Sequence, residues 1–154
     1  TVNHSIVKAM LFFTAGNILS RFHTKDTAKI QGACSVLPIS GALWIAGFLA
    51  ITGSPPFGTF ISEFTILRAA VEQGRWVVAG LYSVFLLVIF VGMSAIVLRM
   101  ALGKSKAGRE RESWTAVLSP IAFALLALLL GVYLPTPLAD KLHGAAHLLG
   151  GLAK

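Results

Sequence analysis

Three titratable residues lie within apolar segments that are long enough to form membrane spans. They are His4, Lys8 and Glu63. His4 and Lys8 are four residues apart, so on a helix they share one face, about 40° apart around its axis. A charge inside a membrane costs at least about 2.5 kcal/mol, so such groups face a bundle interior and commonly mark an ion path. An imidazole, an amine and a carboxyl each exchange protons, and these three residues therefore predict proton transfer.

Each of these residues also has a structural interpretation. His4 and Lys8 are compatible with a helix start at the membrane surface, where a lysine stem lies on apolar surface while its charge reaches water. Against this, twelve uncharged residues follow Lys8, which places it about 20 Å from Arg21 on a helix. Glu63 is compatible with a carboxyl that only hydrogen-bonds a neighbouring helix. Both interpretations stay open at the level of sequence.

The segment Gly53–Gly58 (GSPPFG) precedes Glu63 and predicts an interrupted helix. Broken helices expose backbone groups beside the ion sites of many transporters. An ordinary tight turn between two spans is the alternative. Ser54 is predicted to cap a helix whose first turn accepts proline, which would place Glu63 nine residues, or about 13 Å, along that helix. The candidate residues of the break are Gly53, Ser54, Pro55, Pro56 and Gly58.

Composition indicates which elements must position these residues. The chain is 56% hydrophobic and 12% charged, whereas soluble domains carry about 25% charged residues. Three runs of residues, 30–62, 76–98 and 114–139, contain no charge, and uncharged apolar runs of this length indicate membrane spans. Membrane β-strands are about 10 residues long with alternating polarity, which these runs lack. The predicted fold is therefore an all-α, polytopic transmembrane helix bundle.

We expect about five spans, with a discontinuous helix near Ser54–Gly58. The run 30–62 would be about 50 Å long as one helix, against a hydrocarbon core of about 30 Å, so we expect it to turn at Gly53–Pro56. The spans belong to one bundle over residues 1–134, and residues 135–154 are expected to form a short interfacial helix or tail. The expected spans are 2–20, 33–52, 55–71, 76–100 and 114–134.

The net charge of +7 is carried mainly by short loops. The segment 21–29 holds three Lys/Arg residues and the segment 99–111 holds five. Loops of this kind lie near anionic lipid headgroups, and nucleic-acid binding is not expected because no basic face is formed. The denser segment favours the cytoplasmic side. Five spans would put the segment 21–29 on the opposite side, so the charges give only a weak orientation.

The remaining polar residues predict packing rather than chemistry. Asn17, Thr14 and Ser94 are expected to hydrogen-bond neighbouring helices. His143 and His147 share a helical face but form an incomplete metal site. One cysteine and no glycine-rich phosphate loop after a strand leave no basis for a cofactor. We therefore expect no metal, no cofactor and no catalytic centre in this chain, and its place in an enzyme complex is left open.

Two blocks of sequence resemble a known family. The stretches His4–Asn17 (HSIVKAMLFFTAGN) and Ala50–Leu67 (AITGSPPFGTFISEFTIL) are similar, in order and spacing, to signatures of the antiporter-like membrane subunits of respiratory complex I. The second block and the ending Val132–Leu138 (VYLPTPL) resemble most closely component F of the hydrogenase-4 and formate hydrogenlyase complexes. The resemblance implies that the chain, which begins at Thr1, is the C-terminal part of a longer subunit.

The resemblance also implies roles and surroundings. His4 and Lys8 would belong to a central hydrophilic axis, and Glu63 would be a terminal protonatable group on the discontinuous helix. The chain would translocate protons, or sodium ions, in a prokaryotic inner or cell membrane, with other membrane subunits and the lipid bilayer as partners. Redox chemistry would occur in partner subunits. A stand-alone cation/proton antiporter component and a structural membrane anchor without transport are the alternatives.

Overall fold

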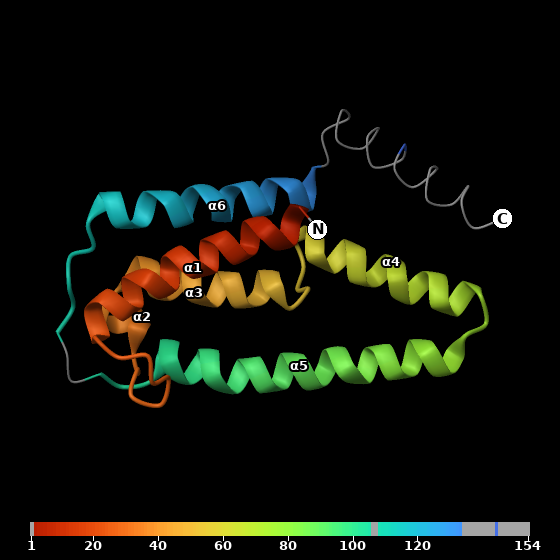
Figure 1. Cartoon of the computed structure of the whole chain (residues 1–154), viewed down its shortest axis with the longest axis horizontal. Helices are drawn as coiled ribbons and strands as arrows, with labels where there is room; N and C mark the ends of the chain where they lie inside the picture. Colours follow the sequence, from red (N-terminus) through yellow and green to blue (C-terminus); the bar gives the residue numbers. More distant parts are fainter. Residues whose placement is uncertain (1, 106–107, 134–143, 145–154) are drawn as a thin grey trace.

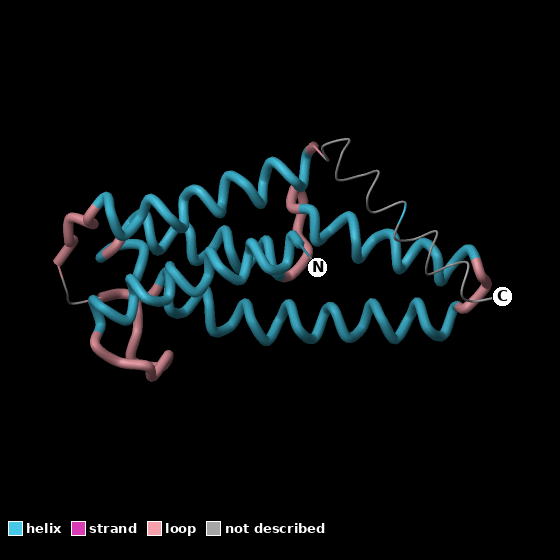
Figure 2. The backbone as a smooth tube through the Cα atoms, turned by 45° about the horizontal axis from the view of Figure 1, so that its top comes forward, coloured by secondary structure: helices cyan, strands magenta, loops and turns pink. Residues whose placement is uncertain are grey.

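The computed structural model describes residues 2–105, 108–133 and 144. These residues form α-helices joined by loops, without a β-strand among them (Figure 2). The predicted all-α class is confirmed. The helices are α1 (Val2–Phe22), α2 (Ala33–Val36), α3 (Pro38–Ile51), α4 (Gly58–Glu72), α5 (Trp76–Leu102) and α6 (Trp114–Val132).

Helices α3 and α4 together form one interrupted helix. They lie one after the other along the length of α5, and both pack against it (Figure 1). With 14 and 15 residues, each is only about 22 Å long, which is less than the hydrocarbon thickness of about 30 Å. The prediction that the chain turns back at Gly53–Pro56 is therefore wrong: the expected spans 33–52 and 55–71 contain the two halves of a single path.

Proline explains why the expected span 33–52 begins as two helices. Leu37 separates α2 from α3 and has a non-helical backbone, with φ −125° and ψ 82°. The residue before a proline is disfavoured in the helical region, whereas proline itself suits the first position of a helix. Accordingly α2 ends at Val36 and α3 starts at Pro38.

The packed core occupies one half of the molecule. Helices α1, α3 and α6 contact one another there, and Val7, Ala50 and Ala127 form a buried cluster between them. A second cluster, around Ile18 and Met100, joins α1 to the end of α5. In the other half α4 pairs with α5, and α5 exposes most of its large apolar side chains.

Helices α5 and α6 are the two described helices that are long and apolar enough to cross a membrane on those criteria. Only 6% of the most apolar stretch of α5 is buried within the chain. Continuous apolar surface of this kind faces lipid or other protein segments rather than water.

Both basic loops lie at the same end of the bundle (Figure 1). Arg21, at the end of α1, forms an ion pair with Glu110 of the α5–α6 loop, and the Glu110 amide donates to the Val36 carbonyl over 2.9 Å. Gly32 adopts φ +71°, and a side chain there would collide with the backbone at Gly103. The expectation that the two loops face opposite sides is wrong, because α3 and α4 cross as one path and not as two.

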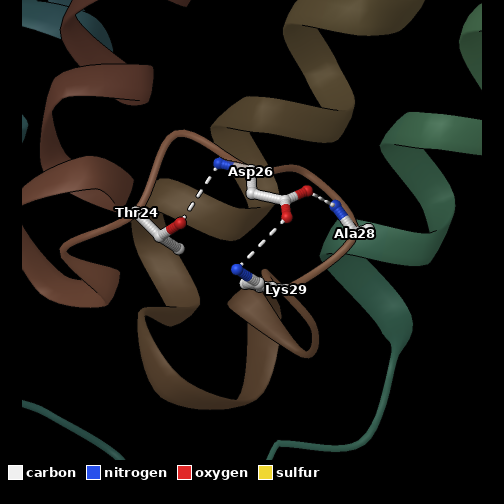
Figure 3. A network of polar contacts seen from close by, with 4 residues as sticks. All are labelled: Thr24, Asp26, Ala28 and Lys29. Carbon is white, nitrogen blue, oxygen red and sulfur yellow. Dashed lines mark hydrogen bonds and ion pairs between the residues drawn. The ribbon is translucent and has the colours of Figure 1, made fainter.

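The loop after α1 is ordered by Asp26 (Figure 3). Its carboxylate accepts a 3.0 Å hydrogen bond from the Ala28 amide, and its own amide donates to the Thr24 hydroxyl over 3.2 Å. Lys29 lies 3.6 Å from the same carboxylate. Asn and Asp side chains commonly fix turns in this way, so this basic loop has a defined shape.

Glu112 joins the α5–α6 loop to the start of α3. Its carboxylate accepts hydrogen bonds from the amides of Ile39 (2.6 Å) and Ser40 (2.9 Å) and from the Ser40 hydroxyl. The fully buried Ser40 hydroxyl also accepts from Asn17, whose amide donates to the Ala116 carbonyl over 3.0 Å. A carboxylate on the free amides of a helix start satisfies them and suits the helix dipole, so Glu112 fixes the position of α3.

Replacing Glu112 with glutamine is expected to destabilise the full-length protein by about 2 kcal/mol, because the part-buried hydrogen bonds to the start of α3 lose their charge assistance. Glu110→Gln removes a partly exposed ion pair and is expected to cost less than about 1 kcal/mol. The stability losses of both variants are measured by unfolding the protein in detergent solution and monitoring its circular dichroism. Equal losses for the two variants would contradict the proposed role of Glu112.

Two predictions about polar residues are corrected. Asn17 does bond neighbouring helices, as expected, but Thr14 and Ser94 donate to the carbonyls of Met10 and Phe90 in their own helices. A hydroxyl four residues after a carbonyl is well placed for such a bond. The expected interfacial helix within 135–154 and the pair His143 and His147 lie outside the described residues, apart from the helical residue 144.

Candidate functional site

The break between α3 and α4 spans residues 52–57. The Ser54 amide donates to the Leu49 carbonyl over 2.9 Å, and the Thr59 hydroxyl donates across the break to the Ala50 carbonyl. The Pro55–Pro56 bond is cis. α4 begins only at Gly58, preceded by Phe57 without a side-chain cap. The prediction that Ser54 caps this helix is wrong, since the two prolines lie in the break itself.

Glu63 lies directly on this break. Because α4 starts at Gly58, Glu63 is five residues, or about 8 Å, into the helix rather than the expected nine residues. Gly53 has φ +69°, a conformation that L side chains rarely adopt, and a Cβ atom built there would collide with the Glu63 carboxylate. The glycine therefore serves the turn and also leaves room for the carboxylate.

A cavity of about 340 Å³ opens beside this carboxyl group, between the break, α4 and α5. The break contributes the residues from Thr52 to Pro55, whereas α5 contributes the apolar residues Leu86, Leu87 and Phe90. Phe48 of α3 and Phe90 of α5 pack with their rings 5.4 Å apart next to it. Glu63 is thus a partly buried acid between the residues of the break and the apolar residues of α5. The lining residues are Thr52, Gly53, Ser54, Pro55, Phe60, Glu63, Phe64, Leu67, Leu86, Leu87 and Phe90.

Tyr82 of α5 is a neighbour of this site that sequence reasoning missed. The Glu63 carboxylate acts electrostatically on its hydroxyl group. Nineteen positions separate the two residues, and only the antiparallel packing of α4 on α5 brings them together. A single tyrosine near the start of an apolar helix carries no sequence signal that it lies within electrostatic range of Glu63.

The start of α1 and the end of α6 close the break from the other side. A Cβ atom on Gly58 would collide with the Asn3 side chain, and one on Gly131 would collide with the Pro56 carbonyl. Among the described residues, the Oδ1 atom of Asn3 is buried and has no hydrogen-bond partner. Buried acceptors of this kind are commonly satisfied by ordered water, so Asn3 is a further polar residue of the site.

His4 and Lys8 share one face of α1, as expected, and both are exposed. Within the described part of the chain neither side chain has a hydrogen-bond or ion-pair partner, and neither contacts Glu63. His4 nevertheless follows Asn3, which touches the break. The structure thus places Glu63 beside Gly53 at one end of the break and Asn3 beside Gly58 at the other, while Lys8 lies farther along an exposed face of α1.

Arg68 does not join this site. It pairs with Glu72 on the same helix, with an Nε–Oε1 distance of 2.6 Å, one turn beyond Glu63 towards the end of α4. Both side chains are mostly exposed. The other acid of α4 is therefore paired, whereas Glu63 forms no ion pair with any residue that the structure describes.

The family model and the similar proteins of known name all point to one family. Residues 1–91 match the family model described as NADH:quinone oxidoreductase/Mrp antiporter, TM. A hydrogenase-4 component F homolog from Methylacidiphilum infernorum is 29% identical over 95% of this chain and 30% of its own length. The NADH-quinone oxidoreductase subunit M of Pseudomonas aeruginosa is 31% identical over 97% of this chain and 30% of its own length. The chain thus spans less than a third of these relatives.

A solved structure shares the fold. A chain of the Mrp complex from Dietzia sp. DQ12-45-1b superposes with a TM-score of 0.72 at 20% identity, covering 84% of this chain and 33% of that chain. The expected likeness to hydrogenase-4 component F and the expected membrane-embedded helical bundle are both confirmed.

Proposed function

Because this chain belongs to the NADH:quinone oxidoreductase/Mrp antiporter transmembrane family, we propose that it forms the C-terminal transmembrane bundle of a longer subunit that carries protons across a prokaryotic cell membrane. The observation that carries the proposal is the contact of the Glu63 carboxylate with Gly53 at the helix break. An acid at an interrupted intramembrane helix is positioned to exchange protons with groups on either side of it.

The proposed path joins the break to the open face of α1. Glu63 faces the cavity of about 340 Å³, Asn3 holds a buried acceptor at the break, and His4 and Lys8 extend along α1. Ordered water between these groups would relay protons from the amine and imidazole to the carboxyl.

The charge distribution supports an orientation. The two basic loops lie at one end, so the described residues of the segments 21–29, 99–105 and 108–111, which include seven of the thirteen Lys/Arg residues, lie on one side of the membrane. Cytoplasmic loops carry an excess of Lys and Arg. We therefore assign this end to the cytoplasm, which leaves the turn between α4 and α5 on the opposite side.

The partners proposed are other membrane subunits of a hydrogenase-4 or complex I-like assembly, in which redox reactions drive transport. The Mrp likeness favours a second candidate, a component of a cation/proton antiporter without a redox partner. Copurification of the full-length protein with a nickel-containing subunit supports the first. If translocation persists in sodium-free buffer, the protein transports protons without sodium ions.

Lys8→Met is expected to lower proton translocation by the full-length protein about fivefold, because the variant removes one protonatable member of the path and leaves its neighbours in place. The matched control is Lys25→Met, in the exposed loop after α1, which is expected to keep the full rate. The measurement is the pH inside reconstituted vesicles, reported by an enclosed dye. If the Lys8 variant pumped at the unmodified rate, this result would contradict a role of α1 in the proton path.

A further inference from the structure

A second cavity, of about 440 Å³, lies at the end of the bundle where the two basic loops meet. It is formed between the start of α3, the start of α6 and the loop residues 109–112, which supply two arginines and two glutamates. This cavity is lined by the start of α3, whereas the cavity beside Glu63 is lined by the residues that follow the end of α3, so the length of α3 lies between them. The proton path described above does not use it.

The two glutamates of this cavity are held by partners inside the chain. Glu112 accepts three hydrogen bonds from the start of α3, and Glu110 pairs with Arg21. Arg109 and Arg111 are exposed and have no hydrogen-bond or ion-pair partner in the described part of the chain. The cavity therefore presents two guanidinium groups, neither of which is in an ion pair within the described part of the chain.

The remaining walls are apolar. Pro38 and Ile39 line one side, and Trp114, which is 72% exposed, stands at the first position of α6. Exposed tryptophans at the ends of membrane helices lie at the level of the lipid headgroups. A ligand that fits these walls has an anionic head and an apolar body.

We propose that this cavity binds the headgroup phosphate of an anionic phospholipid, held by Arg109 and Arg111, with the acyl chains lying along Trp114 and the start of α3. Guanidinium groups bind phosphate through paired, charge-assisted hydrogen bonds. Basic pockets between membrane helices on the cytoplasmic side are suited to anionic lipids. The bound lipid would fasten the α5–α6 loop to the membrane surface.

The test uses the full-length protein in detergent, with phosphatidylglycerol or phosphatidylcholine added and the retained lipid counted by native mass spectrometry. We expect phosphatidylglycerol to bind more tightly than phosphatidylcholine. The double variant R109Q/R111Q is expected to weaken phosphatidylglycerol binding roughly 25-fold and to leave phosphatidylcholine unchanged, since each basic group near anionic lipid contributes a few-fold to affinity.

Matched variants distinguish a loss of binding at this site from a general effect of charge and from misfolding. R109K/R111K keeps the charge and is expected to retain most of the binding, and Arg75→Gln, at the opposite end of the bundle, is expected to leave it unchanged. Inorganic phosphate in large excess should not displace the lipid, because it lacks the apolar body. Equal losses in R75Q, equal affinity for the two lipids, or displacement by inorganic phosphate would each overturn the proposal.

Discussion

Replacing Glu63 with glutamine is expected to reduce proton translocation by the full-length protein at least about 100-fold, because an amide hydrogen-bonds but does not exchange a proton at neutral pH. Glutamine has nearly the same size as glutamate and still fits against Gly53, so the bundle is expected to fold. The measurement is the change of internal pH in reconstituted vesicles, with the amount of folded protein set equal between samples.

Glu72→Gln is the matched control for this experiment. Glu72 lies on the same helix, is exposed and pairs with Arg68, so its loss is expected to leave transport unchanged and to cost less than about 1 kcal/mol of stability. If the Glu63 variant pumped at the unmodified rate, the chain would act as a structural membrane anchor.

Gly53→Ala is expected to slow translocation at least about tenfold and to destabilise the protein by about 2 to 4 kcal/mol. Two costs add at this position: the backbone has φ +69°, and the new methyl group would collide with the Glu63 carboxylate. The carboxylate must then leave the break. Transport in vesicles and thermal unfolding in detergent measure the two effects separately.

Gly74→Ala measures how much of the destabilisation comes from the left-handed backbone conformation alone. Gly74, in the turn between α4 and α5, has φ +68°, but a Cβ atom there meets nothing within 4 Å. We expect a loss of about 1 to 2 kcal/mol and an unchanged transport rate. Similar effects of the two alanine variants on transport would show that the contact between Gly53 and Glu63 has no functional role.

The helix ends were predicted closely where an apolar run stops at charged or loop-forming residues. The expected spans 2–20, 76–100 and 114–134 differ by only two residues at their ends from α1, α5 and α6. In each case an apolar run stops at charged or loop-forming residues, and such a run has few alternatives in a membrane. The position of the break was also predictable, since Gly53–Gly58 concentrates residues that interrupt helices.

The path of the chain after the break was not predictable. Glycine and proline indicate that a helix stops, but they do not fix whether the chain reverses or continues. The structure continues because α5 provides one long surface for both α3 and α4. This one difference also reversed the predicted side of the loop after α1, since the number of crossings determines which loops share a side.

The contacts that define the site and fix α3 are remote in sequence. Glu112 binds Ser40 across 72 positions, and Asn3 meets Gly58 across 55 positions. Neither pair has a local pattern, because a glutamate in a charged loop and an asparagine in the first turn of a helix are ordinary residues there. His4, Lys8 and Glu63 were noticed because charge is costly in a membrane, whereas neutral Asn3 and Tyr82 carry no such signal.

The proposed proton transport requires the Glu63 carboxyl group to gain and lose a proton at the helix break. Infrared difference spectroscopy of the full-length complex during turnover, with glutamate labelled in the carboxyl carbon by ¹³C, tests this directly. We expect a carboxyl carbonyl band that shifts with the label, disappears in E63Q and persists in E72Q. A band that persists unchanged in E63Q, or no carboxyl band during active transport, would contradict the assignment.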